Sequence, residues 1–90
     1  MRAEDITAKK FGTTKWREGY DMDQVDDLLA RATATLAAYE RGDAKRPALT
    51  ADDVVKSRFN QTKFRAGYDQ DHVDDFLDEV IIALRTREQG

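Results

Sequence analysis

The sequence predicts an all-α protein made of two tandem repeats, each a short helix, a loop and a long helix, packed as a pseudo-two-fold helical bundle or short coiled coil. The chain repeats itself at an interval of 48 residues, and its apolar residues recur at helical spacing. Of its 90 residues, 37% are charged and only one is proline. This composition favours long solvated helix faces with few breaks.

The internal repeat is clearest when segment 11–29 is aligned with segment 59–77. Twelve of the 19 positions carry the same residue, among them an Arg-x-Gly-Tyr-Asp run and a Val-Asp-Asp run. A lone unit of about 40 residues rarely buries enough surface to fold, so we expect the repeats to share a core. We divide the chain into a first repeat at 1–41, a linker at 42–48 and a second repeat at 49–90.

Each repeat is predicted to begin with a short helix. In the second repeat Thr50 is a natural N-cap and Asp53 follows at the third helical position, which is close to a capping box. In the first repeat Arg2 occupies the capping position, so we expect that helix to be frayed or shorter. The helical pattern continues through Phe11 and Phe59.

A loop and a long helix complete each repeat. We expect Gly19 and Gly67 to adopt a positive φ at the end of each loop. Asp21 and Asp69 are natural N-caps of the long helices. The long helices are predicted to pair through one apolar stripe each, formed by Val25, Leu28, Leu29, Ala32 and Leu36 and by Val73, Phe76, Leu77, Val80 and Leu84.

The relative direction of the two long helices stays open, because both parallel and antiparallel packing would bury the two stripes. Exchange of repeats between two chains would bury the same surfaces and give a homodimer. Tyr20 and Tyr68, which precede the long helices, are expected to be core residues.

The repeated run Phe-x-x-Thr-Lys-aromatic-Arg-x-Gly-Tyr-Asp-x-Asp-x-Val-Asp-Asp-(Leu/Phe)-Leu resembles the N-terminal domain of DivIVA-family proteins. Those proteins are bacterial cell-pole and division-site scaffolds, and this chain resembles a tandem repeat of their domain. The resemblance implies crossed loops and, at each loop tip, an aromatic residue and an arginine that meet the membrane. By position these are Trp16–Arg17 and Phe64–Arg65. A second copy replaces the family's long C-terminal coiled coil, which puts its large assemblies in doubt here.

Basic residues surround both tip aromatics. Segment 9–18 has a local charge of +3, and segment 56–65 carries four basic residues and no acidic one. Basic and aromatic side chains together suit the surface of an anionic bilayer. We therefore predict a membrane-binding set of Lys15, Trp16, Arg17, Lys63, Phe64 and Arg65. The alternative is a pure protein–protein interaction module without membrane contact, in which both aromatics are buried.

The sequence gives little support to other kinds of site. There is no cysteine, and the acidic helix starts lack the glycine and the final glutamate that a calcium loop requires, since Ala32 and Val80 hold that last position. His72, the one histidine, has no nucleophile at a suggestive spacing. The helix-start aspartates would repel phosphate. We therefore expect no enzyme activity, no catalytic residue, no metal, no cofactor and no nucleic-acid partner.

The function that follows is a cytoplasmic scaffold or adaptor related to bacterial cell division or polar growth. Its expected partners are an anionic membrane surface and cell-division or polar-growth proteins. No stretch approaches 18 apolar residues and no signal peptide is visible. We therefore expect any membrane contact to be peripheral, at the inner face of the cell membrane.

Overall fold

The computed structural model describes residues 1–43, 45 and 47–90, which form an elongated body of 43 × 24 × 18 Å. Its helices and strands occur in the same order in both repeats. The helices are α1 (Ala3–Ala8), α2 (Met22–Arg41), α3 (Ala51–Lys56) and α4 (Gln70–Gln89). The strands are β1 (Thr13–Thr14), β2 (Gly19–Tyr20), β3 (Gln61–Thr62) and β4 (Gly67–Asp69).

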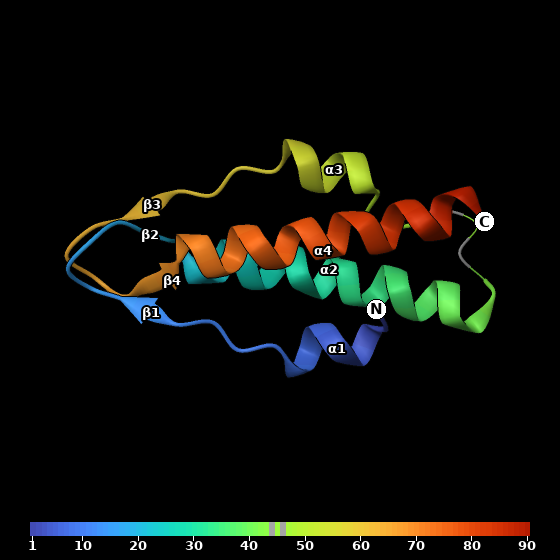
Figure 1. Ribbon diagram of the computed structural model, residues 1–90, viewed down its shortest axis with the longest axis horizontal. Helices are drawn as coiled ribbons and strands as arrows, with labels where there is room; N and C mark the ends of the chain where they lie inside the picture. The colour runs from blue at the N-terminus through green and yellow to red at the C-terminus, as the bar shows by residue number, and fades with distance from the viewer. Residues whose placement is uncertain (44, 46) are drawn as a thin grey trace.

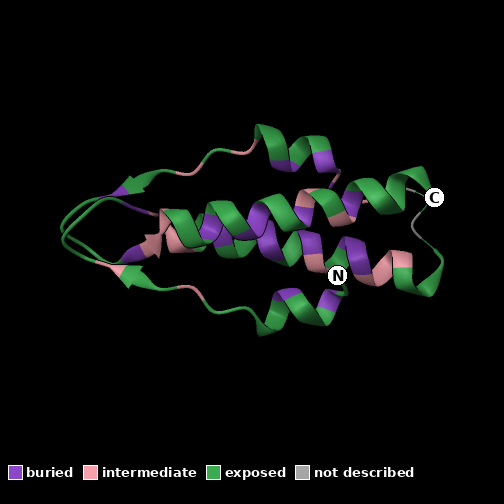
Figure 2. Ribbon diagram, viewed as in Figure 1, coloured by how far each residue is buried: buried purple, intermediate pink, exposed green. Residues whose placement is uncertain are grey.

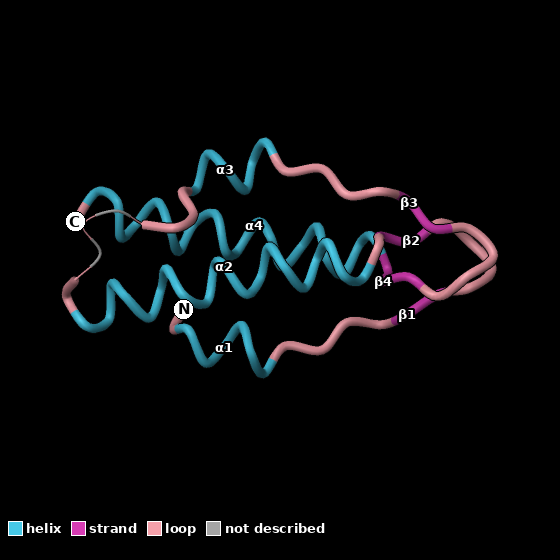
Figure 3. The backbone as a smooth tube through the Cα atoms, turned by 180° about the vertical axis from the view of Figure 1, so that it is seen from behind, coloured by secondary structure: helices cyan, strands magenta, loops and turns pink. Residues whose placement is uncertain are grey.

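The long helices α2 and α4 lie side by side and run parallel, with both N-termini at the same end of the molecule (Figure 1). The view from behind shows the same arrangement (Figure 3). Helix α1 packs on α2, and α3 packs on α4. After α2 ends, the chain returns toward the N-terminal end of the long helices through α3 and the extended segment 57–62. The linker therefore does not have to span the length of a long helix.

The core lies between the two long helices and under the two short ones (Figure 2). All ten residues of the predicted apolar stripes are buried, and Val25, Ala32, Leu36, Val73, Val80 and Leu84 have no accessible surface. The short helices and their lead-ins add Ala3, Ile6, Leu49, Ala51 and Val54. Each fully buried Leu or Val contributes about 1.5–3 kcal/mol relative to an exposed one, so the stripes are the main source of stability.

The predicted all-α class is wrong, because a four-stranded antiparallel sheet joins the two loops and makes the protein mixed α and β. The strand order is β1-β4-β2-β3, and every pair of neighbours joins one repeat to the other. Thr13 pairs with Tyr68, and Tyr20 pairs with Gln61 on one side and Tyr68 on the other. Strands of two or three residues show no alternation of apolar and polar positions, so the sequence pattern carries no signal for them.

We call segments 9–21 and 57–69 the two arms. Since each arm pairs with the arm of the other repeat, the two loops cross at the end of the molecule that holds the N-termini of α2 and α4 (Figure 1). Crossed loops, which the family resemblance implies for two chains, occur here within one chain.

The glycines at the crossing do not have the predicted role. Within the described residues, a positive φ is found at Gly42 and Phe64, not at Gly19 or Gly67. A Cβ atom at Gly19 would lie 2.8 Å from the carbonyl oxygen of Tyr68 in the other arm. Glycine is therefore required here because two backbones approach closely, not because of a left-handed conformation.

The short helices also differ from expectation. Both contain six residues, so the first is not shorter despite Arg2 at its cap position. They end at Ala8 and Lys56, before Phe11 and Phe59, which the sequence pattern had included in the helices. Both phenylalanines lie in the arms and pack against the core from there.

A glutamate near the end of each long helix caps the start of a short helix. Glu40 accepts a hydrogen bond of 2.6 Å from the backbone N–H of Ala3, and Glu88 accepts one of 2.8 Å from that of Ala51. Because the N–H groups of a first helical turn have no partner within the helix, this bond satisfies one of them in each repeat. In the first repeat the carboxylate of Asp5 also accepts a hydrogen bond of 2.8 Å from the N–H of Arg2, the residue at the cap position.

The predicted linker, 42–48, starts where α2 ends, at Gly42 in the left-handed conformation. Ala44 and Arg46 lie outside the described residues. Beyond the linker Leu49 is fully buried, and its N–H donates a hydrogen bond of 3.0 Å to Thr35 Oγ1 of α2. The second short helix is thereby attached to the long helix of the other repeat.

Candidate functional site

The candidate site is the end of the molecule formed by the loops at residues 15–18 and 63–66, which we call the tip (Figure 1). Trp16 is 84% exposed and Phe64 is 72% exposed, which is unusual for large aromatic side chains. Both tip loops are exposed (Figure 2). All six residues of the predicted membrane-binding set are therefore brought together at one end and face solvent: Lys15, Trp16, Arg17, Lys63, Phe64 and Arg65.

The two tip aromatics are held in different ways. Phe64 has a φ of 62°, in the left-handed region that costs a residue with a side chain roughly 1–2 kcal/mol. The Nζ atom of Lys63 lies 5.6 Å from the centre of the Phe64 ring, within range of a cation–π interaction. Trp16, in contrast, has an ordinary φ. The second tip loop thus keeps its aromatic in place at a cost in backbone strain, which is a common feature of binding loops.

The tip arginines pair with the caps of the long helices. Arg17 lies 2.6 Å from the carboxylate of Asp69, and Arg65 lies 3.8 Å from that of Asp21. Both pairs join an arm of one repeat to the helix start of the other. The sequence pointed to both arginines but not to these partners. With Glu18 included, three carboxylates stand against the four basic side chains of the tip, which lowers its net positive charge.

Asp69 and Asp21 cap the long helices as predicted, since they accept hydrogen bonds from the backbone N–H groups of His72 and Gln24. The bond from His72 N–H is the main cause that lowers the pKa of Asp69 below its usual value, and the charge of Arg17 adds to it. Asp69 is thus kept ionised as the partner of Arg17. An exposed arginine in such a pair contributes little stability, so its main effect is to orient the arm.

The base of each arm is held by a tyrosine. Tyr20 donates a hydrogen bond of 2.8 Å to Asp74, and Tyr68 donates one of 2.7 Å to Asp26. The Tyr68 ring also packs on Phe11 at 5.2 Å between ring centres, and Tyr20 packs on Phe59 at 5.3 Å. Both tyrosines are half-buried, so they lie at the edge of the core and not inside it as expected. They fix the arms to the long helices just below the crossing.

The raised pKa values of these two tyrosines lead us to expect that the folded protein loses stability at alkaline pH. Burial and the hydrogen bond to Asp74 raise the pKa of Tyr20 to about 12, and the hydrogen bond to Asp26 and burial raise that of Tyr68 to about 12, against an ordinary value of 10.0. Because the folded protein holds these protons more tightly than the unfolded chain, their contribution is complete below pH 10.0 and is lost as the pH rises toward about 12.

Urea denaturation across this pH range measures the effect, and tyrosinate absorbance follows the titration. The double variant Tyr20→Phe/Tyr68→Phe is the control, and its free energy of unfolding should fall less over the same range. An equal fall in both proteins would show that other groups cause the loss.

His72 and its counterpart Gln24 hold the opposite arm. The Nδ1 atom of His72 accepts a hydrogen bond of 3.1 Å from the N–H of Gly12, and Oε1 of Gln24 accepts one of 2.7 Å from the N–H of Asn60. Each bond therefore joins the long helix of one repeat to the arm of the other. The structure gives His72 a positioning role in the arm.

Glutamine at position 72 should therefore replace histidine without loss, because glutamine makes the matching bond in the first repeat. We expect His72→Gln to change the free energy of unfolding by less than about 0.5 kcal/mol and His72→Ala to lower it by about 0.5–1 kcal/mol. Urea denaturation of the two variants tests this. An equal loss in both would contradict the assigned hydrogen bond.

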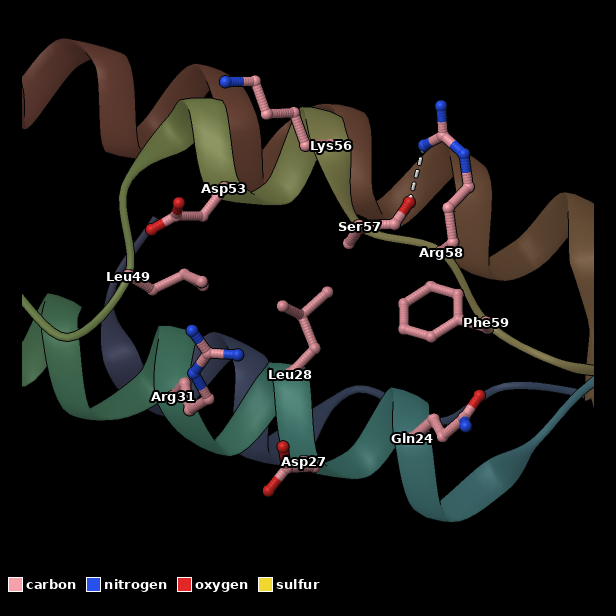
Figure 4. A pocket seen from close by; sticks show the side chains of 10 residues that line it. All are labelled: Gln24, Asp27, Leu28, Arg31, Leu49, Asp53, Lys56, Ser57, Arg58 and Phe59. Atoms are coloured by element: carbon pink, nitrogen blue, oxygen red, sulfur yellow. Dashed lines mark hydrogen bonds between the residues drawn. The ribbon is translucent and has the colours of Figure 1, made fainter.

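A pocket of 410 Å³ lies between α2, α3 and the start of the second arm, away from the tip (Figure 4). Figure 4 shows Leu28, Leu49 and Phe59 turned toward its centre, with charged side chains around the rim. The rim residue Arg58 donates a hydrogen bond of 2.7 Å to the carbonyl oxygen of Ser57. Within the described residues, no group of three or more His, Asp or Glu side chains is placed to hold a metal ion.

None of the helices in the described part of the chain is long and apolar enough to cross a membrane. Comparisons of the chain with protein-family models, with curated proteins and with solved structures find no match. The resemblance to the DivIVA N-terminal domain therefore rests on the repeated motif alone.

Proposed function

We propose that the protein is a non-enzymatic scaffold or adaptor that contacts an anionic membrane surface through its tip. The observation that carries this proposal is the exposure of Trp16 and Phe64 at the same end of the molecule, with basic side chains on both sides of each. The resemblance to the DivIVA N-terminal domain supports a role in bacterial cell division or polar growth. A cytoplasmic location, peripheral at the inner face of the cell membrane, is part of the same proposal.

The size of the two aromatics makes this contact favourable. Burying an aromatic ring in the bilayer interface contributes about 2 kcal/mol, and each cation near an anionic surface adds about 1 kcal/mol. One loop alone would bind weakly. Because the crossed strands fix both loops at one end, the second aromatic binds as part of the same event as the first. The carboxylates beside the tip reduce the electrostatic part, so the aromatics should carry most of the binding.

The alternative of a pure protein-interaction module assumed that both aromatics are buried, and they are exposed. An exposed aromatic pair would also suit a protein partner, so the experiment must separate a lipid surface from a protein one. Purified vesicles do this, because they contain no protein.

The proposal predicts that the chain floats with anionic vesicles at low salt, and that it binds less at high salt and less to neutral vesicles. The variant Trp16→Ser/Phe64→Ser should stay folded and lose at least about tenfold in binding, since two exposed rings are removed. Ile82→Ser, which removes an exposed apolar residue away from the tip, is the matched control and should bind normally.

Two results would count against membrane contact. One is no binding of the wild-type chain to anionic vesicles at low salt. The other is an equal loss in the tip variant and the Ile82→Ser control.

A further inference from the structure

A band of apolar side chains crosses the outer face of α4, away from the tip. Ile82 at its centre is 66% exposed, and Met1, which is 37% exposed, lines a groove with it. Val55 of α3, which is 45% exposed, lines a neighbouring hollow together with Ile81 of α4. Ile81 and Ala83, the neighbours of Ile82 in the chain, are half-buried. On the side of Met1 the surface is hollowed into a groove of 510 Å³ that includes Ile82 and Ala83.

The internal repeat shows that the fold does not require this band. At the matching positions of the first repeat, 48 residues earlier, Val55 corresponds to Thr7, Ile81 to Thr33 and Ile82 to Ala34. Leu49, which matches Met1, is fully buried. Among the described residues, the exposed large apolar side chains outside the tip are Met1, Val55 and Ile82, so all three belong to this band. The same scaffold thus presents small or polar side chains on α2 where α4 presents large apolar ones.

The charges along α4 change sign at the band. Asp75, Asp78 and Glu79 come before Ile82, and Arg85 comes after it, all at spacings that place them on the same exposed face. In the described part of the chain none of these four charged residues forms an ion pair with another residue. A surface that is apolar at its centre, acidic toward one end and basic toward the other is complementary to a copy of itself turned end for end.

We propose that the outer face of α4 is a self-association surface on which a second copy of the chain packs antiparallel, with a two-fold axis near Ile82. Ile82 of one copy then meets Ile82 of the other, and Asp78 of each copy faces Arg85 of its partner. Asp78 and Arg85 lie seven residues apart, on the same edge of the face. The two-fold axis therefore creates two equivalent ion pairs, each between Asp78 of one copy and Arg85 of the other. A parallel arrangement would place like charges opposite each other, which is unfavourable.

The contact is small, because one helix face with its neighbours buries less than the roughly 1,200–2,000 Å² of a stable complex. The dimer should therefore be weak and form only at high protein concentration. It leaves the tip free and places the two tips at opposite ends, because the N-terminus of α4 lies beside the tip (Figure 1). This inference does not rest on the proposed membrane contact, and oligomeric state alone tests it.

Sedimentation equilibrium of the full chain over a wide range of concentrations is the experiment. The wild-type chain should dimerise reversibly, and Ile82→Ser should weaken the dimer by at least about tenfold. Asp78→Arg and Arg85→Asp should each weaken it, and the double variant Asp78→Arg/Arg85→Asp should restore it, because the two charges change places. Ala34→Ser, at the matching position of α2, is the control and should have no effect.

Each variant should fold, because all the substituted side chains on α4 are exposed, and circular dichroism checks this. A wild-type chain that stays monomeric at millimolar concentration would overturn the proposal. A dimer that Ile82→Ser does not weaken would also overturn it. That result is expected instead if two chains exchange repeats through the buried stripes. A double charge variant no better than either single one would also overturn it.

Discussion

Replacing Gly67 with alanine is expected to lower the free energy of unfolding by about 1–3 kcal/mol, because it forces a side chain into the crossing of the two arms. A Cβ atom at Gly67 would overlap Thr62 Oγ1 and lie 3.0 Å from the carbonyl oxygen of Tyr20. Neither neighbour has room to move, since Thr62 is 1% exposed and the carbonyl belongs to a paired strand. Urea denaturation gives the loss, and hydrogen exchange shows whether the strand N–H groups become unprotected.

Two control variants show whether the loss comes from the close approach of the two arms at Gly67 or from any substitution near the tip. Ala66→Ser changes the exposed neighbour of Gly67 and should be neutral. Adding Thr62→Ala to Gly67→Ala should recover part of the stability, because it removes the nearest obstructing atom. If Gly67→Ala alone keeps full stability and full protection, the arms do not cross as closely as the structure shows.

The second large effect is expected in the paired stripes, where Leu84→Ala should lower the free energy of unfolding by about 2–5 kcal/mol. Leu84 has no accessible surface, so its truncation leaves a cavity that the surrounding helices can only partly fill. Ile82→Ala is the matched control, because it removes a similar side chain two residues away on the exposed face of α4. Its effect should stay within about 0.5 kcal/mol.

Both variants should be measured at a concentration low enough to keep the chain monomeric. Equal losses for Leu84→Ala and Ile82→Ala would mean that the stripe between α2 and α4 is not the main source of stability.

The features that could be predicted from sequence are local ones. The stripes of α2 and α4 follow from apolar residues three and four positions apart, and the caps Asp21, Asp69 and Thr50 follow from residue type next to such a stripe. In each case the signal lies within a few residues of the structure that it specifies.

The features that could not be predicted depend on contacts between the repeats. The strands are too short to show a pattern, and their partners lie about 50 residues away, so the sheet was missed and the class was wrong. Phe11 continues the spacing of α1 but packs on Tyr68 of the other arm. A helical spacing alone therefore does not show which element a side chain packs against.

In the candidate site, too, the local features could be predicted and those that depend on contacts between the repeats could not. The tip residues could be found because aromatic and basic residues lie next to each other in the chain. Their exposure and their pairing with the opposite helix caps could not, since both depend on how the arms cross. One signal was available: Asp26 and Asp74, which accept from the two tyrosines, are identical in both repeats, as are Glu40 and Glu88.

The central claim is that the crossed arms present Trp16 and Phe64 to a lipid surface, and the fluorescence of Trp16, the one tryptophan, tests it most directly. Without vesicles the emission should lie at long wavelength, because the side chain is 84% exposed. On titration with anionic vesicles at low salt it should shift to shorter wavelength as the indole enters the interface. A short-wavelength emission in the free protein, or no shift with anionic vesicles, would contradict the claim.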